Sequence, residues 1–172
     1  MTSSLRLAAA DRRDLLAELL ALDAGTRVET ARDGLLAVRS GEGAPLRFYW
    51  YPYPLAAPTA ELDGLAVASL LDLVLMKLGA VISRGTRRDF VDLYLATRAL
   101  PLDEALAASG GKFAHVGDFA LQAAKALADF SEAEDEPMPE LARPLAWGEV
   151  REWATAEAVR AGRRVLAGEG VR

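Results

Sequence analysis

The sequence predicts an α+β fold in which a small antiparallel sheet of about three strands is followed by a helical bundle. Alternating, aromatic-rich segments separated by turn dipeptides lie between residues 26 and 51. From residue 69 onward, helix-capping signals and apolar residues at helical spacing replace them. With 172 residues, of which 52% are hydrophobic and 26% charged, the chain can bury a core without disulfides.

The first third of the chain is predicted to form one helix and an antiparallel meander. The helix covers residues 11–24, with leucines on one face, and ends at Gly25 as its C-cap. The dipeptide Asp33-Gly34 and the glycine-rich segment 41–43 mark two tight turns. These turns divide the alternating segments into strands at residues 26–32, 35–39 and 46–51.

Two capping boxes define the first helices of the second part. Ser69 and Asp72 begin a helix that ends near residue 83, and Thr86 and Asp89 begin one that ends near residue 98. The apolar stretch at residues 65–82 therefore predicts a buried helix and not a membrane span. Further helices are predicted from Pro101 to about residue 110, and at residues 116–130 and 147–166.

The organisation follows from these elements. Residues 1–66 form the sheet region with its N-terminal helix, and residues 67–172 form the helical region, the two together making one structural unit. An acidic linker occupies residues 132–136, and residues 168–172 are expected to be frayed.

The composition excludes several kinds of chemistry. The chain has no cysteine, so disulfides, thiolate metal sites and a cysteine nucleophile are excluded, and a cytoplasmic location is favoured. Its single histidine, His115, excludes a pair of histidine metal ligands. The net charge of −5 argues against general nucleic-acid binding. We therefore expect neither a metal site nor a membrane partner.

Lys77 is the ionisable residue of the apolar helix that capping does not explain. A lysine in such a helix either extends its amino group to water or meets an anion. Arg84 follows at i+7 and shares its face, so the two cations together suit a phosphate group. The alternative is that the stem of Lys77 packs while its amino group reaches solvent.

The next helix carries a second group of charges. Asp89 and Asp92 are three residues apart and share a face, and Arg88 and Asp92 form an i,i+4 pair. This pattern also fits a capped surface helix with ordinary ion pairs. We expect Lys77, Arg84 and Asp92 to converge on one partly open cleft between the sheet and the helices.

Several segments resemble a known family. They are YPYPL at 51–55, ASLLDL at 68–73, MKL at 76–78 and SRGTRRDFVDLY at 83–94, followed by EDEPMP at 134–139 and PLAWGEV at 144–150. In this order and spacing they resemble the AbiEii/AbiGii family of nucleotidyltransferase-like proteins, the toxins of abortive-infection toxin–antitoxin pairs. The resemblance covers most of the chain from about residue 14.

The resemblance implies a nucleotide pocket and assigns roles to five residues. Lys77, Arg84 and Arg88 would bind a nucleotide or phosphate, and Asp89 and Asp92 would hold the catalytic positions. The family's Gly-Ser element and Asp-x-Asp strand would lie before residue 11, and its third acidic position aligns with Arg47. Residues 1–66 then correspond to part of a nucleotidyltransferase sheet.

Three interpretations of this pattern are open. The first is a truncated or degenerate family member that binds no cofactor and lacks transferase activity as the chain stands. The second is a non-catalytic protein-interaction module in which Lys77 and the aspartates are structural. The third is an active nucleotidyltransferase whose start was assigned too late, which would use Mg²⁺ and a nucleoside triphosphate.

The resemblance also predicts partners. Without the strands that precede residue 11 in the family, the sheet would have an unpaired edge and exposed apolar surface near Phe48 and Trp50. A homodimer would cover both. The alternative is that residues 1–10, with Leu5 and Leu7, fold back as a substitute strand. The other expected partners are a cognate antitoxin and a nucleotide, with nucleic acid only as a transfer acceptor.

Overall fold

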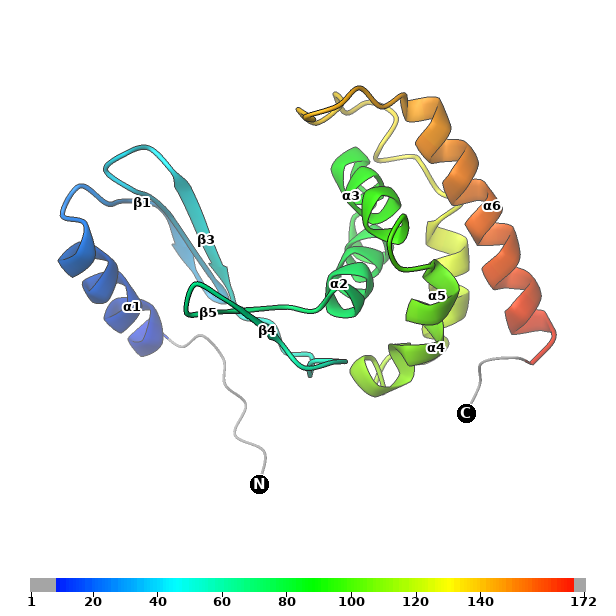
Figure 1. The fold of residues 1–172 in the computed structure, drawn as a ribbon, viewed down its shortest axis with the longest axis horizontal. Helices are drawn as coiled ribbons and strands as arrows, with labels where there is room; N and C mark the ends of the chain where they lie inside the picture. The colour runs from blue at the N-terminus through cyan, green and yellow to red at the C-terminus, as the bar shows by residue number, and fades with distance from the viewer. Residues whose placement is uncertain (1–8, 169–172) are drawn as a thin grey trace. The chain divides into compact units, whose positions relative to one another are not determined.

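The computed structural model describes residues 9–168 (Figure 1). The chain divides into two compact units between Tyr53 and Pro54. The fold is α+β, with a small antiparallel sheet followed by helices, as predicted. The expectation for residues 169–172 and the substitute strand around Leu5 and Leu7 lie outside the described residues.

The first unit consists of one helix and one sheet. These are α1 (Ala9–Leu22) and the strands β1 (Arg27–Arg32), β2 (Leu35–Arg39) and β3 (Pro45–Tyr49). The strands pair antiparallel in the order β1-β2-β3, which confirms the predicted meander. The central strand carries the buried residues of the sheet, Leu36, Ala37 and Val38, whereas β1 is exposed along its whole length.

The end of α1 differs from the expected glycine cap. The helix ends at Leu22, and Gly25 does not adopt the left-handed conformation of a C-cap glycine. Instead, the Asp23 carboxylate accepts hydrogen bonds from the N–H groups of Gly25, at 2.8 Å, and Gly41, at 2.6 Å. Gly25 is needed for a close approach, because a Cβ atom there would lie 2.8 Å from Gly41 Cα.

The first two strands of the second unit form a hairpin that the sequence analysis missed. β4 (Ala60–Leu62) and β5 (Leu65–Val67) pair antiparallel, so residues 65–67 are a strand and not the start of the buried helix. Asp63 and Gly64 both have positive φ, at 50° and 80°, as a tight two-residue hairpin turn requires. The Asp-Gly dipeptide between apolar residues was the signal for this turn.

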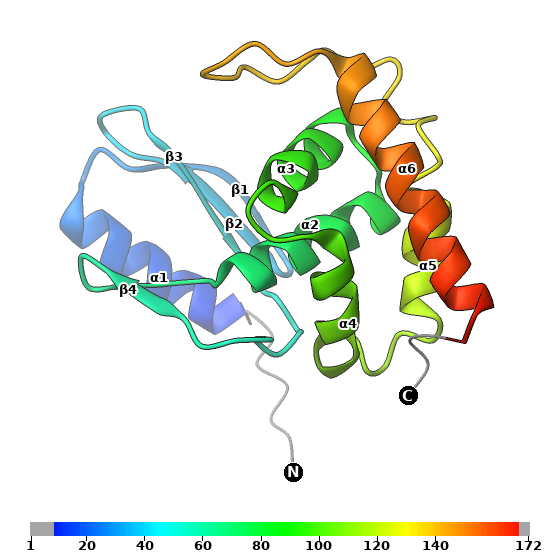
Figure 2. The same cartoon turned by 45° about the vertical axis from the view of Figure 1, so that its right-hand side comes forward.

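Helices form the rest of the second unit (Figures 1 and 2). They are α2 (Leu70–Ser83), α3 (Arg87–Thr97), α4 (Leu102–Lys112), α5 (Phe119–Ala126) and α6 (Trp147–Leu166). Ser69 and Thr86 cap α2 and α3 by accepting from the N–H groups of Asp72 and Asp89, which confirms both capping boxes. Pro101 lies at the N-cap of α4 and not in its first turn.

α5 is shorter than the predicted helix over residues 116–130. It begins after Asp118, whose φ of 53° is left-handed and incompatible with a continuing helix. It ends where Ala128 and Asp129 donate to carbonyls only three residues earlier, at Lys125 and Ala126. The chain then tightens into turns instead of continuing as an α-helix.

The core of the second unit packs α2 and α3 together with the start of α6 and the segment before it. Val74, Leu75 and Leu78 of α2 are buried. Phe90 of α3 contacts the rings of Phe130 and Trp147, with centroids 5.2 and 5.9 Å apart. These contacts pack α2 and α3 into the core of the second unit, which positions the charged residues described below. Among the described residues, no helix combines the length and hydropathy that crossing a membrane requires.

Candidate functional site

The candidate site lies where α2 ends and α3 begins. The two helices are joined by a short turn at residues 84–86, in which Gly85 has a φ of 55°. A side chain at Gly85 would be strained in this conformation, and its Cβ would lie 3.4 Å from the Val81 carbonyl oxygen. The tight turn places Lys77 of α2, and Arg84 directly after α2, opposite the Asp89 and Asp92 carboxylates of α3.

Arg84 and Asp89 form a bidentate ion pair. The guanidinium binds the carboxylate with both arms, Nε to Oδ2 at 2.7 Å and Nη2 to Oδ1 at 2.8 Å. Asp89 is 1% exposed, whereas the side chain of Arg84 is 61% exposed. The Asp89 carboxylate thus anchors an arginine whose outer face is open to solvent.

The Asp89 carboxylate has further partners that keep it ionised. It accepts a hydrogen bond from the Thr86 hydroxyl at 2.5 Å, in addition to those from Arg84. Burial on its own would raise the pKa of Asp89, but the hydrogen bonds and charge of Arg84 and the Thr86 hydroxyl outweigh it, so the pKa is lowered. Asp89 is therefore a charged, fully engaged group.

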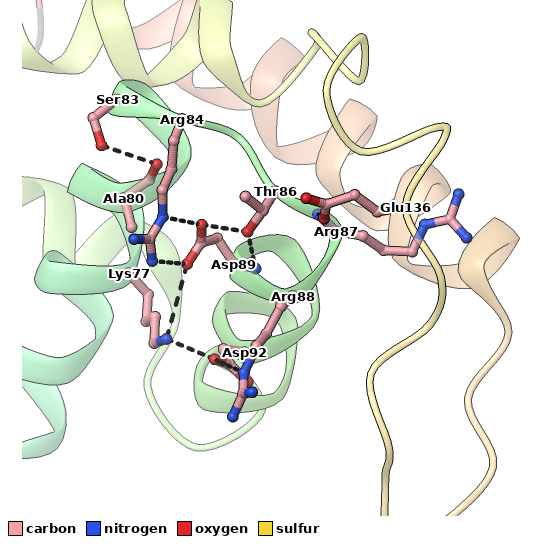
Figure 3. Close-up of polar contacts among 10 residues, drawn as sticks. All are labelled: Lys77, Ala80, Ser83, Arg84, Thr86, Arg87, Arg88, Asp89, Asp92 and Glu136. Carbon is pink, nitrogen blue, oxygen red and sulfur yellow. Dashed lines mark hydrogen bonds and ion pairs between the residues drawn. The ribbon is translucent and has the colours of Figure 1, made fainter. Parts of the chain in front are cut away.

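Lys77 meets an anion, and that anion belongs to the chain. Its Nζ lies 2.6 Å from Asp92 Oδ2 and 3.9 Å from Asp89 Oδ1 (Figure 3). Arg88 approaches the same Asp92 oxygen with its Nε at 3.8 Å. The side chains of Lys77 and Asp92 are 33% and 29% exposed, so this pair lies at the surface of the unit and not in its core.

The structure thus brings the predicted site residues together. Lys77, Arg84, Arg88, Asp89 and Asp92 form one cluster, hereafter the α2–α3 charge cluster (Figure 3). Three cations and two carboxylates leave one net positive charge. All five residues belong to α2, α3 and the turn between them, within the second unit. Their assignment to nucleotide binding and catalysis stays a prediction.

The sequence analysis missed a buried ion pair in the same unit. Lys112 Nζ lies 2.7 Å from Asp72 Oδ1 and 3.0 Å from the Pro54 carbonyl oxygen, and both side chains are 0% exposed. Asp72 also accepts from the N–H groups of Ala56 and Ala57. Its role is therefore larger than the predicted one of a capping partner. No local pattern links Lys112 to a partner 40 residues away.

The acidic segment before α6 docks on α3 and does not act as a free linker. Glu136 accepts from the backbone N–H of Arg87 at 2.7 Å, which gives α3 a second cap (Figure 3). The Arg87 side chain in turn donates to the carbonyl oxygens of Ala133 and Glu134. Its guanidinium also lies 4.8 Å from the centre of the Trp147 ring.

No family model, no curated protein and no solved structure matches the chain. Within residues 9–168, no group of three or more histidine, aspartate or glutamate side chains is placed to hold a metal ion. The functional argument therefore depends on the α2–α3 charge cluster itself.

Proposed function

We propose that the protein is a nucleotidyltransferase-like protein of the abortive-infection toxin–antitoxin type, which binds a phosphorylated ligand at the α2–α3 charge cluster without transferring a nucleotide. The observation that supports binding is the net positive charge of this cluster beside solvent. The side chains of Arg84 and Arg88 are 61% and 76% exposed. Asp89 binds Arg84 through two hydrogen bonds, and Asp92 lies 3.8 Å from Arg88 Nε. Phosphate is an anion that such guanidinium groups bind in two-point contacts.

The absence of transfer is proposed from the residue at one position. The resemblance places an acidic metal ligand on the strand before residues 51–54, where this chain carries Arg47. Arg47 lies in β3. A cation there would repel the Mg²⁺ ions that neutralise the charge developing during nucleotidyl transfer.

Calorimetric titration with ATP and, separately, with inorganic phosphate tests the binding proposal. We expect both to bind, and Lys77→Gln and Arg88→Gln each to weaken binding about tenfold, since each removes a charge-assisted contact. Lys125→Gln, which changes an exposed lysine of α5, is the matched control and should leave the affinity unchanged. Failure of both probes to bind, or equal affinities for all variants, would overturn the proposal.

The second part of the proposal predicts the result of a transfer assay. Incubation of the protein with radiolabelled nucleoside triphosphates, Mg²⁺ and either RNA or protein acceptors should yield no labelled product. A Mg²⁺-dependent product that disappears in Asp92→Asn would contradict it and would show an active nucleotidyltransferase. This outcome is separate from the binding result, because a ligand can bind without reacting.

A non-catalytic interaction module is the second candidate. The observation that favours it is that the charges of Lys77 and Arg84 are already matched by Asp92 and Asp89, as in a structural network. We further propose two partners that either candidate would accept, a cognate antitoxin protein and a second copy of the chain. Co-expression with a candidate antitoxin, followed by co-purification, tests the first of these, and the mass of the purified chain in solution tests the second.

A further inference from the structure

The second unit contains a groove that is separate from the α2–α3 charge cluster. It has a volume of about 400 Å³ and lies between the C-terminal half of α3 and the segment that leads into α6. Its apolar walls are formed by Leu95 of α3 and by Leu141, Pro144 and Leu145 of the segment. Leu95 is 47% exposed, so an aliphatic side chain already faces solvent there.

One end of the groove is polar and built around a buried tyrosine. The Tyr94 hydroxyl donates to the Glu149 carboxylate and accepts from Arg98 Nη1, at 3.0 Å. Arg98 also lies over the Tyr94 ring, 5.5 Å from its centre. The hydrogen bond to Glu149, together with burial, raises the pKa of Tyr94, so the hydroxyl stays protonated. The tyrosine holds Arg98 in place at the groove.

The charge of the groove is positive. Arg98 and Arg143 both line it, and both are exposed. Glu149 is the acidic residue among the lining residues, and its carboxylate is engaged by Tyr94. The groove therefore combines an aliphatic floor with two guanidinium groups, which complements a ligand that carries aliphatic groups next to carboxylates.

The backbone of the segment supplies further binding groups. Residues 140–145 form no helix or strand, and none of their backbone N–H and C=O groups is hydrogen-bonded to another part of the described chain. A peptide lying along such a segment can pair with these groups, whereas its side chains enter the adjacent groove. This favours a peptide over a compact small molecule as the occupant.

From these observations we propose that the groove between Leu95 and residues 141–145 binds a peptide segment of a partner protein in which aliphatic residues alternate with acidic ones. The aliphatic side chains pack on Leu95, Leu141 and Leu145. The carboxylates pair with Arg98 and Arg143. Because the α2–α3 charge cluster takes no part, this proposal stands or fails independently of the proposed function.

Fluorescence anisotropy with two labelled peptides tests the proposal. One short peptide alternates leucine with aspartate, and the other alternates leucine with lysine. We expect the full chain to bind the acidic peptide and not the basic one, with affinity that falls as salt is added. Equal affinity for the two peptides, or no binding of the acidic one, would overturn the proposal.

Variants locate the binding surface. Arg98→Gln and Arg143→Gln should each weaken the binding of the acidic peptide about tenfold, because each removes a charge-assisted contact. The exposed Arg163 of α6 lies outside the groove, so Arg163→Gln is the matched control for a lost surface charge. Arg143 makes no side-chain hydrogen bond within the described residues, so its substitution keeps the test valid even if Arg98→Gln disturbs folding.

Amide chemical shifts in the uniformly ¹⁵N-labelled protein complete the test. The acidic peptide should shift the signals of Leu95 and of residues 141–145 and leave those of residues 151–163, which lie outside the groove, largely unchanged. Shifts confined to other parts of the chain, or affinities that are equal in Arg98→Gln, Arg143→Gln and Arg163→Gln, would show that the peptide binds elsewhere and would refute the proposal.

Discussion

At the level of single residues, the pair formed by Lys112 and Asp72 is the most informative contact of the chain. Both side chains are completely removed from solvent, and together they bind the backbone at Pro54, Ala56 and Ala57. Taking two charges out of water is costly unless the remaining donors and acceptors are satisfied. Here they are satisfied by the segment that opens the second unit, which explains why the pair is tolerated.

Removing one member of this pair should destabilise the protein strongly. Lys112→Met leaves the Asp72 carboxylate buried without its cation, and we expect a loss of about 3 kcal/mol in the free energy of unfolding. Adding Asp72→Asn should recover part of that loss, because the amide still accepts a hydrogen bond but carries no charge. Guanidinium unfolding curves of the wild-type protein, Lys112→Met, Asp72→Asn and the double variant measure this. Simple addition of the two losses would show that the pair is not coupled.

The same pair predicts how stability depends on pH. Burial alone would raise the pKa of Asp72, but hydrogen bonds from Ala56, Lys112 and Ser69 lower it to about 2. The pKa of the carboxyl is therefore lower in the folded protein than in the unfolded chain, which binds a proton more readily. The stability due to Asp72 is present above about pH 4 and is lost as the pH falls through about 2.

Unfolding measurements between neutral and acid pH test this dependence. The contribution of Asp72 should be about 2 kcal/mol at neutral pH and should vanish on acidification. Asp72→Asn should flatten the acid limb of the stability curve. Asp63→Asn, in the exposed hairpin turn, is the control and should preserve the limb. Parallel curves for the wild-type protein and Asp72→Asn would contradict the assignment.

At the level of elements, the capping boxes position the helices and also shape the charge cluster. Thr86 accepts from the backbone N–H of Asp89, and its hydroxyl donates to the Asp89 carboxylate. The residue that caps α3 is thus also a partner of the carboxylate that binds Arg84. The ends of the two helices and the arrangement of the cluster cannot be changed separately.

Substitution at this cap should therefore affect both stability and ligand binding. Thr86→Ala should lower the free energy of unfolding by about 1–2 kcal/mol, because it removes the cap and one partner of Asp89. It should also weaken phosphate binding, since Arg84 loses part of its support. Thr86→Ser retains the hydroxyl and should restore both properties in thermal unfolding and calorimetry. A Thr86→Ser protein as unstable as Thr86→Ala would show that the hydroxyl is not responsible.

At the level of the whole molecule, the sheet of the first unit is the basis for the proposed self-association. Its order is β1-β2-β3, so β1 and β3 are its edge strands within the described residues. A register shift between Val28 and Thr30 distorts β1, and such irregularities discourage edge pairing. β3 is regular and exposes Leu46 and Tyr49. We therefore assign the proposed homodimer contact to β3.

Sedimentation velocity at micromolar concentration tests the homodimer. We expect a dimer, and we expect Tyr49→Lys to shift it to monomer, since a charge on an edge strand opposes pairing of two copies. Val159→Lys alters another exposed apolar position, on α6, and should leave the dimer intact. A wild-type protein that sediments as a monomer would refute self-association, and an unchanged dimer in Tyr49→Lys would refute the contact at β3.

The sequence by itself determined the elements whose signals are local. The caps of α2 and α3, the three-stranded meander and the bounds of α6 depend on residues a few positions apart, and all were predicted. The hairpin at residues 60–67 had a local signal of the same kind in Asp63-Gly64 and could have been predicted too. Helical phase together with the family resemblance predicted that Lys77, Arg84 and Asp92 would converge, and they belong to one cluster. The expected cleft between the sheet and the helices stays a prediction.

Only the tertiary structure decided which groups satisfy the buried charges and backbone donors. Lys112 lies 40 residues from Asp72, and Glu136 lies 49 residues from Arg87, so no spacing along the chain links them. From sequence periodicity, the amino group of Lys77 could either reach solvent or meet an anion. The packing of α3 on α2 places it 2.6 Å from Asp92 Oδ2. Such pairings depend on how whole elements pack, because the energy of a charge is set by everything that surrounds it.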